Sequence, residues 1–265
     1  MTQGRALIVG ASHAGVQLTA SLRQEGWSGE VIMIGDEPAL PYQRPPLSKA
    51  YLADKSSLAE LAIRKAEFYG KHDIRVVRGT VARLDRAAQR VKLSDGTTMD
   101  YDALALCTGG RARSLPVPGV DLAGVFYLRT FTDVESIRAS AAPGRCAVIV
   151  GGGYIGLETA ASLRALGLEV TVLEAADRVL ERVTAPAVSA FYERVHRDAG
   201  VVIRTGALVE AMVGDDRVRE VVLSGGERVS ADLVIVGVGL VPNTELAVES
   251  GLDVEDGIVI DDLAR

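Results

Sequence analysis

A glycine-rich turn directly after an apolar strand is the clearest chemical signature in the sequence. Residues 146–150 are apolar and of strand length, and they end in Gly-Gly-Gly-Tyr-Ile-Gly at positions 151–156. In this G-x-G-x-x-G pattern a backbone can approach a pyrophosphate at the positive end of a helix. We expect Gly151 to make the turn, Gly153 to face the pyrophosphate and Gly156 to pack the helix on the sheet.

An acidic residue follows this turn at the spacing of a ribose site. Residues 157–166 are rich in Ala and Leu and predict a helix, and a second apolar strand at 170–173 leads into Glu174. A carboxylate about 20 residues after the glycines accepts hydrogen bonds from both hydroxyls of an adenosine ribose. A 2′-phosphate would meet the like charge of Glu174, so the unit should favour NAD over NADP. Arg178 is the one nearby cation that would weaken this preference. The alternative, a glycine-rich turn without a ligand, is disfavoured by the complete order of elements.

A weaker copy of the same unit opens the chain. A strand at residues 6–9 leads into Gly10, Gly15 closes the motif, and Ser12 stands where the middle glycine is expected. A serine still offers its N–H and its hydroxyl to phosphate, although the close approach that glycine allows becomes harder. His13 could contact a phosphate, or it could be an exposed loop histidine without a role.

The N-terminal copy also ends in acidic residues. A helix at 16–24 and a strand at 31–34 are predicted, and the chain then reaches Asp36 and Glu37. One of the two should bind a ribose, and Asp36 lies nearer the strand end. Two such units in one polypeptide suggest two nucleotide cofactors and electron transfer between them.

Composition excludes several classes of function. The chain has 265 residues, of which 48% are hydrophobic, enough for the cores of two domains. With 29 Lys and Arg against 35 Asp and Glu, and no basic stretch, nucleic acid is not an expected partner. Apolar runs of about 18 residues and an export signal are both missing, so we expect a cytoplasmic protein without membrane association. Cys107 and Cys146 are expected to be buried, reduced thiols.

The same plan repeats along the chain. Each unit has a strand–helix–strand half with a glycine-rich turn, a small antiparallel insert and a last strand that ends in a glycine-rich loop. This order predicts an α/β fold of two Rossmann-like dinucleotide-binding domains with parallel sheets, in a glutathione-reductase-like architecture. The predicted domains are 1–113 plus 244–265, and 114–243. Further strands are expected at 74–77, 81–84, 90–93, 101–110, 201–204, 218–223 and 231–236.

Several longer motifs occur along the chain. They are PYQRPPLSKAYL (41–52), LSDG (93–96), YDALALCTGGRAR (101–113), FYLRT (126–130), VIVGGGYIGLE (148–158), RVLERVTAPAVSAFYE (178–193) and VGLVPNTELA (238–247). On these motifs the chain resembles the FAD-dependent pyridine-nucleotide oxidoreductases, and within them the ferredoxin reductases of bacterial oxygenase systems. The resemblance covers essentially the whole chain, and the PPLSK and ERVTAP blocks are specific to this subgroup.

The resemblance implies a relay in which NADH reduces FAD by hydride transfer and FAD passes single electrons to a small iron–sulfur protein of the 2Fe–2S ferredoxin type. By matching positions, the residues implied for FAD are Gly10, Ser12, His13, Ala14, Gly15, Asp36, Glu37, Arg44, Lys49, Val81, Thr108, Gly109 and Arg129. Those implied for NAD are Gly151, Gly153, Tyr154, Ile155, Gly156, Glu158, Glu174 and the loop at Gly239.

Lys49 and Glu158 are the candidate catalytic residues. A cation near the flavin would stabilise the negative charge that develops as hydride arrives, and Glu158 could pair with Lys49 and orient the nicotinamide. A surface lysine and a helix-surface glutamate are the alternatives. Arg44 could hold phosphate or be a solvated loop charge.

Absent motifs narrow the chemistry further. A cysteine pair positioned to receive flavin electrons is missing, so direct electron transfer is favoured over a dithiol relay. No metal-ligand cluster is recognisable in the sequence, so no metal site is expected.

Family members continue beyond the last residues of this chain into a flavin-binding strand and an interface domain, so we expect an incomplete FAD unit and an absent interface domain. Two alternatives to a ferredoxin reductase stay open. The chain could be a reductase for rubredoxin, nitrite reductase or another acceptor, or it could be a nucleotide-binding module without turnover.

Overall fold

The structure is a computed structural model that describes residues 4–265, and these divide into two compact units. The first unit comprises residues up to 43, 59–111 and 241–265, and the second comprises 44–58 and 112–240. Residues 44–58 lie within the predicted first domain, whereas the structure groups them with the second unit. The reason is local packing, because Leu47 and Leu52 of this segment are 1% and 0% exposed.

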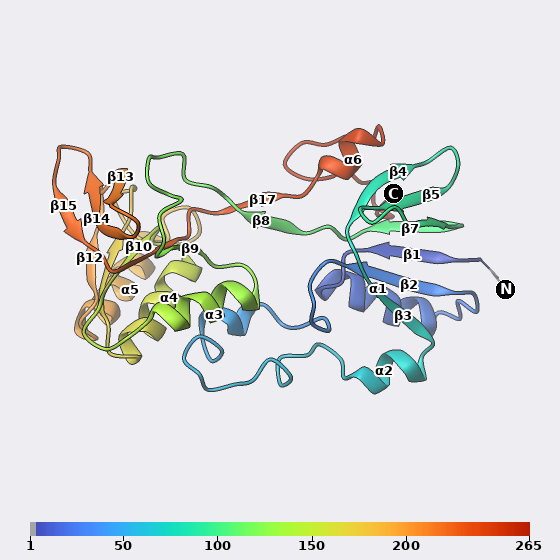
Figure 1. Cartoon of the computed structure of the whole chain (residues 1–265), viewed down its shortest axis with the longest axis horizontal. Coiled ribbons are helices and arrows are strands. Elements are labelled where there is room, and N and C mark those ends of the chain that lie inside the picture. The colour runs from blue at the N-terminus through green and yellow to red at the C-terminus, as the bar shows by residue number, and fades with distance from the viewer. Residues whose placement is uncertain (1–3) are drawn as a thin grey trace. The chain divides into compact units, whose positions relative to one another are not determined.

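A parallel sheet in the order β3-β2-β1-β7 is the centre of the first unit (Figure 1). An antiparallel insert of β4, β5 and β6 lies on one side of it. The elements are β1 (Ala6–Val9), α1 (His13–Gln24), β2 (Val31–Gly35), α2 (Ala66–Lys71), β3 (Ile74–Arg78), β4 (Val81–Asp85), β5 (Arg90–Leu93), β6 (Thr98–Asp100), β7 (Ala103–Leu106) and α6 (Glu245–Glu249).

The first unit buries both faces of its sheet, as a parallel sheet requires. Alternate residues of β1 point to opposite faces. Ile8 packs in a cluster with Val16 of α1, while Leu7 packs in another cluster with Leu84 and Val91 of the insert. The sheet is therefore held between helices and a β-insert, and the carboxyl end of β1 remains free to lead into the glycine-rich loop.

The second unit repeats this plan around a five-stranded parallel sheet in the order β12-β11-β10-β16-β9 (Figure 1). Its antiparallel insert is β13-β14-β15. The elements are the 3₁₀ helix η1 (Pro45–Ser48), β9 (Val125–Tyr127), α3 (Phe131–Ser140), β10 (Cys146–Val150), α4 (Tyr154–Ala165), β11 (Glu169–Leu173), α5 (Pro186–Asp198), β12 (Val202–Arg204), β13 (Val209–Gly214), β14 (Val218–Leu223), β15 (Arg228–Ser230) and β16 (Leu233–Val236). Strands β8 (Gly110–Ala112) and β17 (Leu240–Pro242) pair where the chain changes units.

In both sheets the strand order reverses at the strand that precedes the glycine-rich loop. β1 is flanked by β2 and β7, and β10 is flanked by β11 and β16. In open α/β sheets such a reversal opens a crevice at the carboxyl ends of the strands, where ligands bind. Each glycine-rich loop thus lies at the strand-order reversal of its sheet, as the predicted α/β fold with two Rossmann-like units requires.

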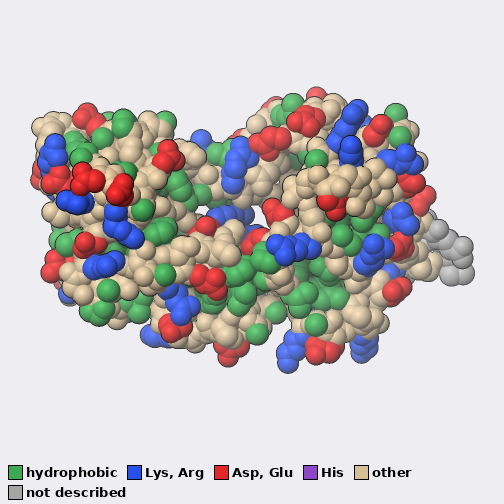
Figure 2. Space-filling view, viewed as in Figure 1, with side chains coloured by type: hydrophobic (Ala, Val, Ile, Leu, Met, Phe, Trp, Pro, Cys, Tyr) green, Lys and Arg blue, Asp and Glu red, His purple; other side chains and the backbone are tan. Residues whose placement is uncertain are grey.

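Charges of both signs are interspersed on the face shown in Figure 2, without a large patch of one sign. Within residues 4–265, no helix combines the length and the apolar character needed to cross a bilayer. The same residues contain no group of three or more His, Cys, Asp or Glu side chains arranged to hold a metal ion.

Candidate functional site

The glycines of the second unit make the turn from β10 into α4. Gly151 has φ +111°, and a Cβ at this position would lie 2.4 Å from the carbonyl oxygen of Gly237. A Cβ on Gly156 would lie 2.1 Å from the carbonyl oxygen of Gly151. A Cβ on Gly153, the N-cap of α4, would meet nothing within 4 Å. Gly151 and Gly156 are therefore required by the protein's own packing, while Gly153 faces open space where a ligand can approach.

Glu174 lies directly beside this loop. Its Oε2 accepts a hydrogen bond of 2.6 Å from the N–H of Gly152, and its Oε1 accepts one of 2.8 Å from the N–H of Ala176. Two backbone donors thus fix both oxygens of the carboxylate at the end of β11. This position is the one at which a nucleotide ribose is bound in Rossmann units.

A cavity of about 410 Å³ opens beside the loop and the carboxylate, within the range of ligand-binding pockets. Of the residues predicted for NAD, it is lined by Gly151, Gly153, Tyr154 and Glu174. Ile155, Gly156, Glu158 and Gly239 are not among the residues that line it, and the strand end after β16 contributes Gly237 and Val238 instead.

The two arginines near Glu174 differ in their contacts. Arg178 donates from Nη1 to the carbonyl of Thr184 and to Oγ of Ser189, at 2.9 and 2.7 Å, and from Nη2 to the carbonyl of Glu181. Arg178 therefore holds the following loop together. Arg182 lines the cavity, and it is the cation that the sequence reasoning missed. Its position in the ERVTAP block was the only sequence signal for it.

Tyr154 is 47% exposed at the rim of the cavity. Its ring meets that of Tyr192, from α5, in an edge-to-face arrangement with centroids 6.3 Å apart. The aromatic side chain at the centre of the glycine motif is thus supported by α5 while one side of it faces solvent.

Lys49 and Glu158 form an ion pair in the second unit, with 2.9 Å between Nζ and Oε1. Lys49 also donates to the carbonyl of Pro45 at 3.1 Å. The other carboxylate oxygen of Glu158 accepts a hydrogen bond of 2.6 Å from the hydroxyl of Ser48. Glu158 lies on α4 immediately after the glycine-rich loop, so the pair is built on the helix that the nucleotide motif begins.

The glycine-rich loop of the first unit has the same packing. Gly10 has φ +117°, and a Cβ there would lie 2.0 Å from the carbonyl oxygen of Cys107. A Cβ on Gly15 would lie 2.0 Å from the carbonyl oxygen of Gly10. Ser12 is the N-cap of α1, yet its side chain makes no capping hydrogen bond. The hydroxyl and the first N–H groups of α1, at His13 and beyond, are therefore available to an anion; His13 and Ala14 are both exposed.

Asp36 and Glu37, the acidic residues after β2, have surroundings that differ from each other. The hydroxyl of Tyr42 donates a hydrogen bond to the carboxylate of Glu37. Asp36 is exposed and, within residues 4–265, forms neither a hydrogen bond nor an ion pair through its side chain. A Cβ on Gly35 would lie 2.4 Å from Cβ of Ala11, so the strand end and the loop are in close contact. Asp36 is thus the carboxylate next to the loop that is free to bind a ribose.

Thr108 and Gly109 lie at the carboxyl end of β7, joined to Asn243. The hydroxyl of Thr108 donates to the carbonyl of Asn243 at 2.7 Å, and the Asn243 side-chain amide donates to the Thr108 carbonyl at 2.9 Å. The Asn243 N–H donates to the Gly109 carbonyl at 2.9 Å. Asn243, in the VPN sequence, thus holds the loop after β7, and the sequence pattern gave no separate signal for it.

The remaining residues implied for FAD lie in different parts of the structure. Val81 begins β4 and packs on the insert side of the first sheet. Arg44 and Arg129 belong to the second unit, where Nη1 of Arg44 donates to the carbonyl of Arg129 at 2.8 Å. The structure brings these two arginines together, and their role toward FAD stays a prediction.

Both cysteines are free thiols, and both are partly exposed, so the expectation that they are buried was wrong. Burial nevertheless raises the pKa of the Cys107 thiol. For Cys146, burial is the largest cause of a raised pKa, and the nearby carboxylates of Glu169 and Asp232 add to it. Raised pKa values keep both sulfurs protonated, and thiols react as nucleophiles mainly when ionised.

Comparison with known proteins agrees with this geometry. A family model described as pyridine nucleotide-disulphide oxidoreductase matches residues 4–265. Putidaredoxin reductase of Pseudomonas putida is 48% identical over 263 residues, which are 97% of this chain and 62% of that protein. Rhodocoxin reductase of Rhodococcus erythropolis is 45% identical over 261 residues, which are 98% of this chain and 61% of that protein.

A solved structure shows the same arrangement of elements. The crystal structure of the covalent putidaredoxin reductase–putidaredoxin complex matches with a TM-score of 0.95 and 46% identity, over 99% of this chain and 64% of that chain. The chain therefore spans about three-fifths of the length of the relatives it matches.

Proposed function

Because the chain belongs to the pyridine nucleotide-disulphide oxidoreductase family, we propose that it is an NADH-dependent flavoprotein reductase that passes electrons through FAD to a small iron–sulfur protein. The observation that carries the proposal is the Lys49–Glu158 ion pair on the helix of the nucleotide motif. A positive charge held at this place is what a hydride-accepting site needs.

The second unit supports the NADH part of the proposal. Gly153 leaves open space at the N-terminus of α4, where free N–H groups and the helix dipole favour a pyrophosphate. The carboxylate of Glu174 is fixed beside it and would accept hydrogen bonds from ribose hydroxyls. A 2′-phosphate would face this charge, so NADH is the expected reductant.

The first unit fits FAD on the same grounds. Side chains at Gly10 and Gly15 would collide with the backbone, and the unused hydroxyl of Ser12 and the exposed Asp36 flank the loop. We propose that FAD binds the predicted domain 1–113 plus 244–265 and that NAD binds the predicted domain 114–243, although residues 44–58 pack in the second unit. FAD, when bound, accepts two electrons as hydride and releases them singly, which nicotinamide cannot do.

The protein's own residues would act mainly through placement and charge. Lys49 would stabilise negative charge at the reacting end of the cofactors, and Glu158 would hold the Lys49 ammonium and orient the nicotinamide amide. The Thr108–Gly109–Asn243 hydrogen bonds would keep the carboxyl end of β7 in place beside Gly10.

The acceptor is proposed from the relatives. Proteins named for rhodocoxin and putidaredoxin match this chain over nearly its whole length, and a structure of one bound to putidaredoxin has the same fold. A 2Fe–2S protein of the ferredoxin type is therefore the proposed acceptor.

Flavin content and turnover of the purified chain test the proposal. We expect flavin absorbance bands, NADH-dependent reduction of ferricyanide, and faster reduction of a 2Fe–2S ferredoxin than of a rubredoxin. Tight NADH binding by a chain that takes up no FAD would identify a nucleotide-binding module without turnover. A rubredoxin reduced in preference to every ferredoxin would instead reassign the acceptor.

A further inference from the structure

The segment that contains Lys49 is fastened to the second unit along its whole length. Residues 44–58 belong to this unit, although the residues on both sides of the segment belong to the first. Leu47 and Leu52 are buried in it, and Arg44 donates to the backbone at Arg129. The position of Lys49 is thus set by contacts within the second unit.

Ser48 is held at two points by one helix. Its hydroxyl donates to Oε2 of Glu158 at 2.6 Å, and its carbonyl accepts a hydrogen bond of 2.7 Å from the hydroxyl of Ser162. Glu158 and Ser162 are four residues apart on α4, so their side chains lie on the same face one turn apart. Ser48 is 3% exposed and Ser162 is 9% exposed, so water does not compete for these bonds.

The Lys49–Glu158 pair needs such support because it is partly exposed. The side chains of Lys49 and Glu158 are 49% and 30% exposed. Ion pairs at this level of exposure are worth little by themselves, since two mobile side chains must be held in one geometry. The two oxygens of the Glu158 carboxylate have different partners. Oε2 accepts a hydrogen bond from buried Ser48, and Oε1 pairs with Lys49.

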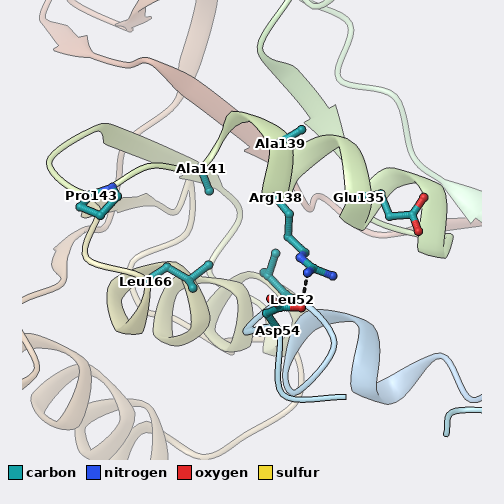
Figure 3. A pocket seen from close by; sticks show the side chains of 8 residues that line it. All are labelled: Leu52, Asp54, Glu135, Arg138, Ala139, Ala141, Pro143 and Leu166. Carbon is teal, nitrogen blue, oxygen red and sulfur yellow. Dashed lines mark hydrogen bonds and ion pairs between the residues drawn. The ribbon is translucent and has the colours of Figure 1, made fainter. Parts of the chain in front are cut away.

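The other end of the segment is fixed in a separate place. Figure 3 shows Asp54 and Leu52 beside Arg138 of α3, and all three line an open cavity of about 680 Å³. Arg138 forms an ion pair with Asp54, and the hydroxyl of Tyr51 donates to Glu135 at 3.1 Å. Residues on either side of Lys49 are thus anchored, and the Lys49 ammonium is held by Glu158 and by the carbonyl of Pro45.

We propose that Ser48 and Ser162 are positioning residues that fix the carboxylate of Glu158, and thereby hold the Lys49 ammonium, before any cofactor binds. The inference rests on the role given to Lys49 and Glu158 in the proposed function. The geometry itself requires neither FAD nor NADH, so it can be tested separately from turnover.

Competitive acylation of lysines in the native 265-residue chain is the test. The rate at Lys49 is measured by mass spectrometry relative to Lys65, Lys71 and Lys92, which lie in the first unit. In Ser48→Ala we expect the relative rate at Lys49 to rise about three- to tenfold, the factor that corresponds to losing one ordinary hydrogen bond. In Ser162→Ala we expect a smaller rise in the same direction.

A double-mutant cycle separates positioning from general loosening. Glu158→Gln should raise the relative rate at least as much as Ser48→Ala, and adding Ser48→Ala to Glu158→Gln should raise it no further. Ser136→Ala, which removes an exposed serine hydroxyl on α3, is the matched control and should leave the rate unchanged.

An unchanged Lys49 rate in Ser48→Ala would overturn the proposal, as would additive effects in the double variant. Thermal unfolding of each variant shows whether the substitution destabilises the whole protein. A rise at Lys49 that is matched at the reference lysines would also count against positioning. A flavin-free chain that still shows the Lys49 response would support the positioning role while contradicting the proposed function.

Discussion

The two glycine-rich loops have nearly the same packing and different ligand-facing residues. A Cβ on Gly15 or on Gly156 would come within 2.0 or 2.1 Å of the carbonyl oxygen that begins its own loop. The middle position differs, with Ser12 in one loop and an open Gly153 in the other.

The acidic residues differ as well. Glu174 is bound by two backbone N–H groups next to its loop, whereas Asp36 is exposed and its neighbour Glu37 is bound by Tyr42. The loop's backbone turn is thus a shared requirement of the fold, while the residues that meet a nucleotide can be changed separately. The carboxylate of Glu174 in the second unit is held by the protein's own backbone, whereas Asp36 in the first unit is exposed.

The largest effect is expected from the packing glycine. Gly156→Val should destabilise the second unit by about 2–3 kcal/mol, because the added side chain must displace the Gly151 carbonyl from a closely packed turn. Gly153→Ala is the matched control and should change stability by less than about 1 kcal/mol while weakening NADH binding. Calorimetric unfolding and NADH titration measure the two effects. Equal loss of stability in both variants would remove the distinction between packing and ligand-facing glycines.

The two acids should control different nucleotides. Glu174→Ala should weaken NADH binding by about 1–3 kcal/mol, the worth of charge-assisted hydrogen bonds, and should narrow the preference over NADPH. Asp36→Ala should lower FAD retention and leave NADH binding unchanged. Isothermal titration with each nucleotide decides this. If the unmodified chain already binds NADPH more tightly than NADH, the role given to Glu174 is wrong.

Acid should destabilise the second unit before the first. Burial of His196 on α5 lowers its pKa from the ordinary value of 6.5, so the unfolded chain takes up this proton first as the pH falls. Stability that is fully present above pH 6.5 is therefore lost as the pH drops through the lowered pKa of the folded state. Calorimetry between neutral and mildly acidic pH should show a smaller loss in His196→Gln. Identical pH dependence in both proteins would contradict the argument.

The smallest effect is expected at the middle position of the first loop. Ser12→Gly makes this loop resemble the second one and should change stability by only a few tenths of a kcal/mol, since the Ser12 side chain makes no capping bond. Flavin binding should tighten if the serine side chain hinders close approach, and should weaken if its hydroxyl binds phosphate. Fluorescence titration of the apoprotein with FAD decides between these two roles, and an unchanged affinity would show that neither applies.

Much of the fold could be predicted because local signals and tertiary packing agree. The strand before each glycine motif and the helix after it lie where they were predicted, although α1 and α4 begin three residues earlier, at His13 and Tyr154. The last residues of each glycine motif are helical because the loop is packed. The low helix propensity of glycine alone would place the start of each helix later.

Helix α5 shows where sequence reasoning fails. Its sequence was noted only as a motif, because its apolar residues do not mark its buried face. Phe191 and Val195 are 53% and 46% exposed, while the polar Ser189 and His196 are 1% and 9% exposed. Hydrophobic periodicity would therefore predict the exposed face of this helix as its buried face. Pro186 at its start was the remaining local signal.

The sequence by itself determined the two nucleotide units, because a turn, a helix start and an acid at a fixed spacing are local requirements within one short stretch of chain. Only the tertiary structure decided that Ser48 meets Glu158, since their positions differ by 110 and neither spacing nor periodicity extends that far, while the Lys49–Glu158 pair was expected from the family resemblance alone. It also decided that residues 44–58 belong with the second unit, because burial of Leu47 and Leu52 depends on a surface formed by distant segments.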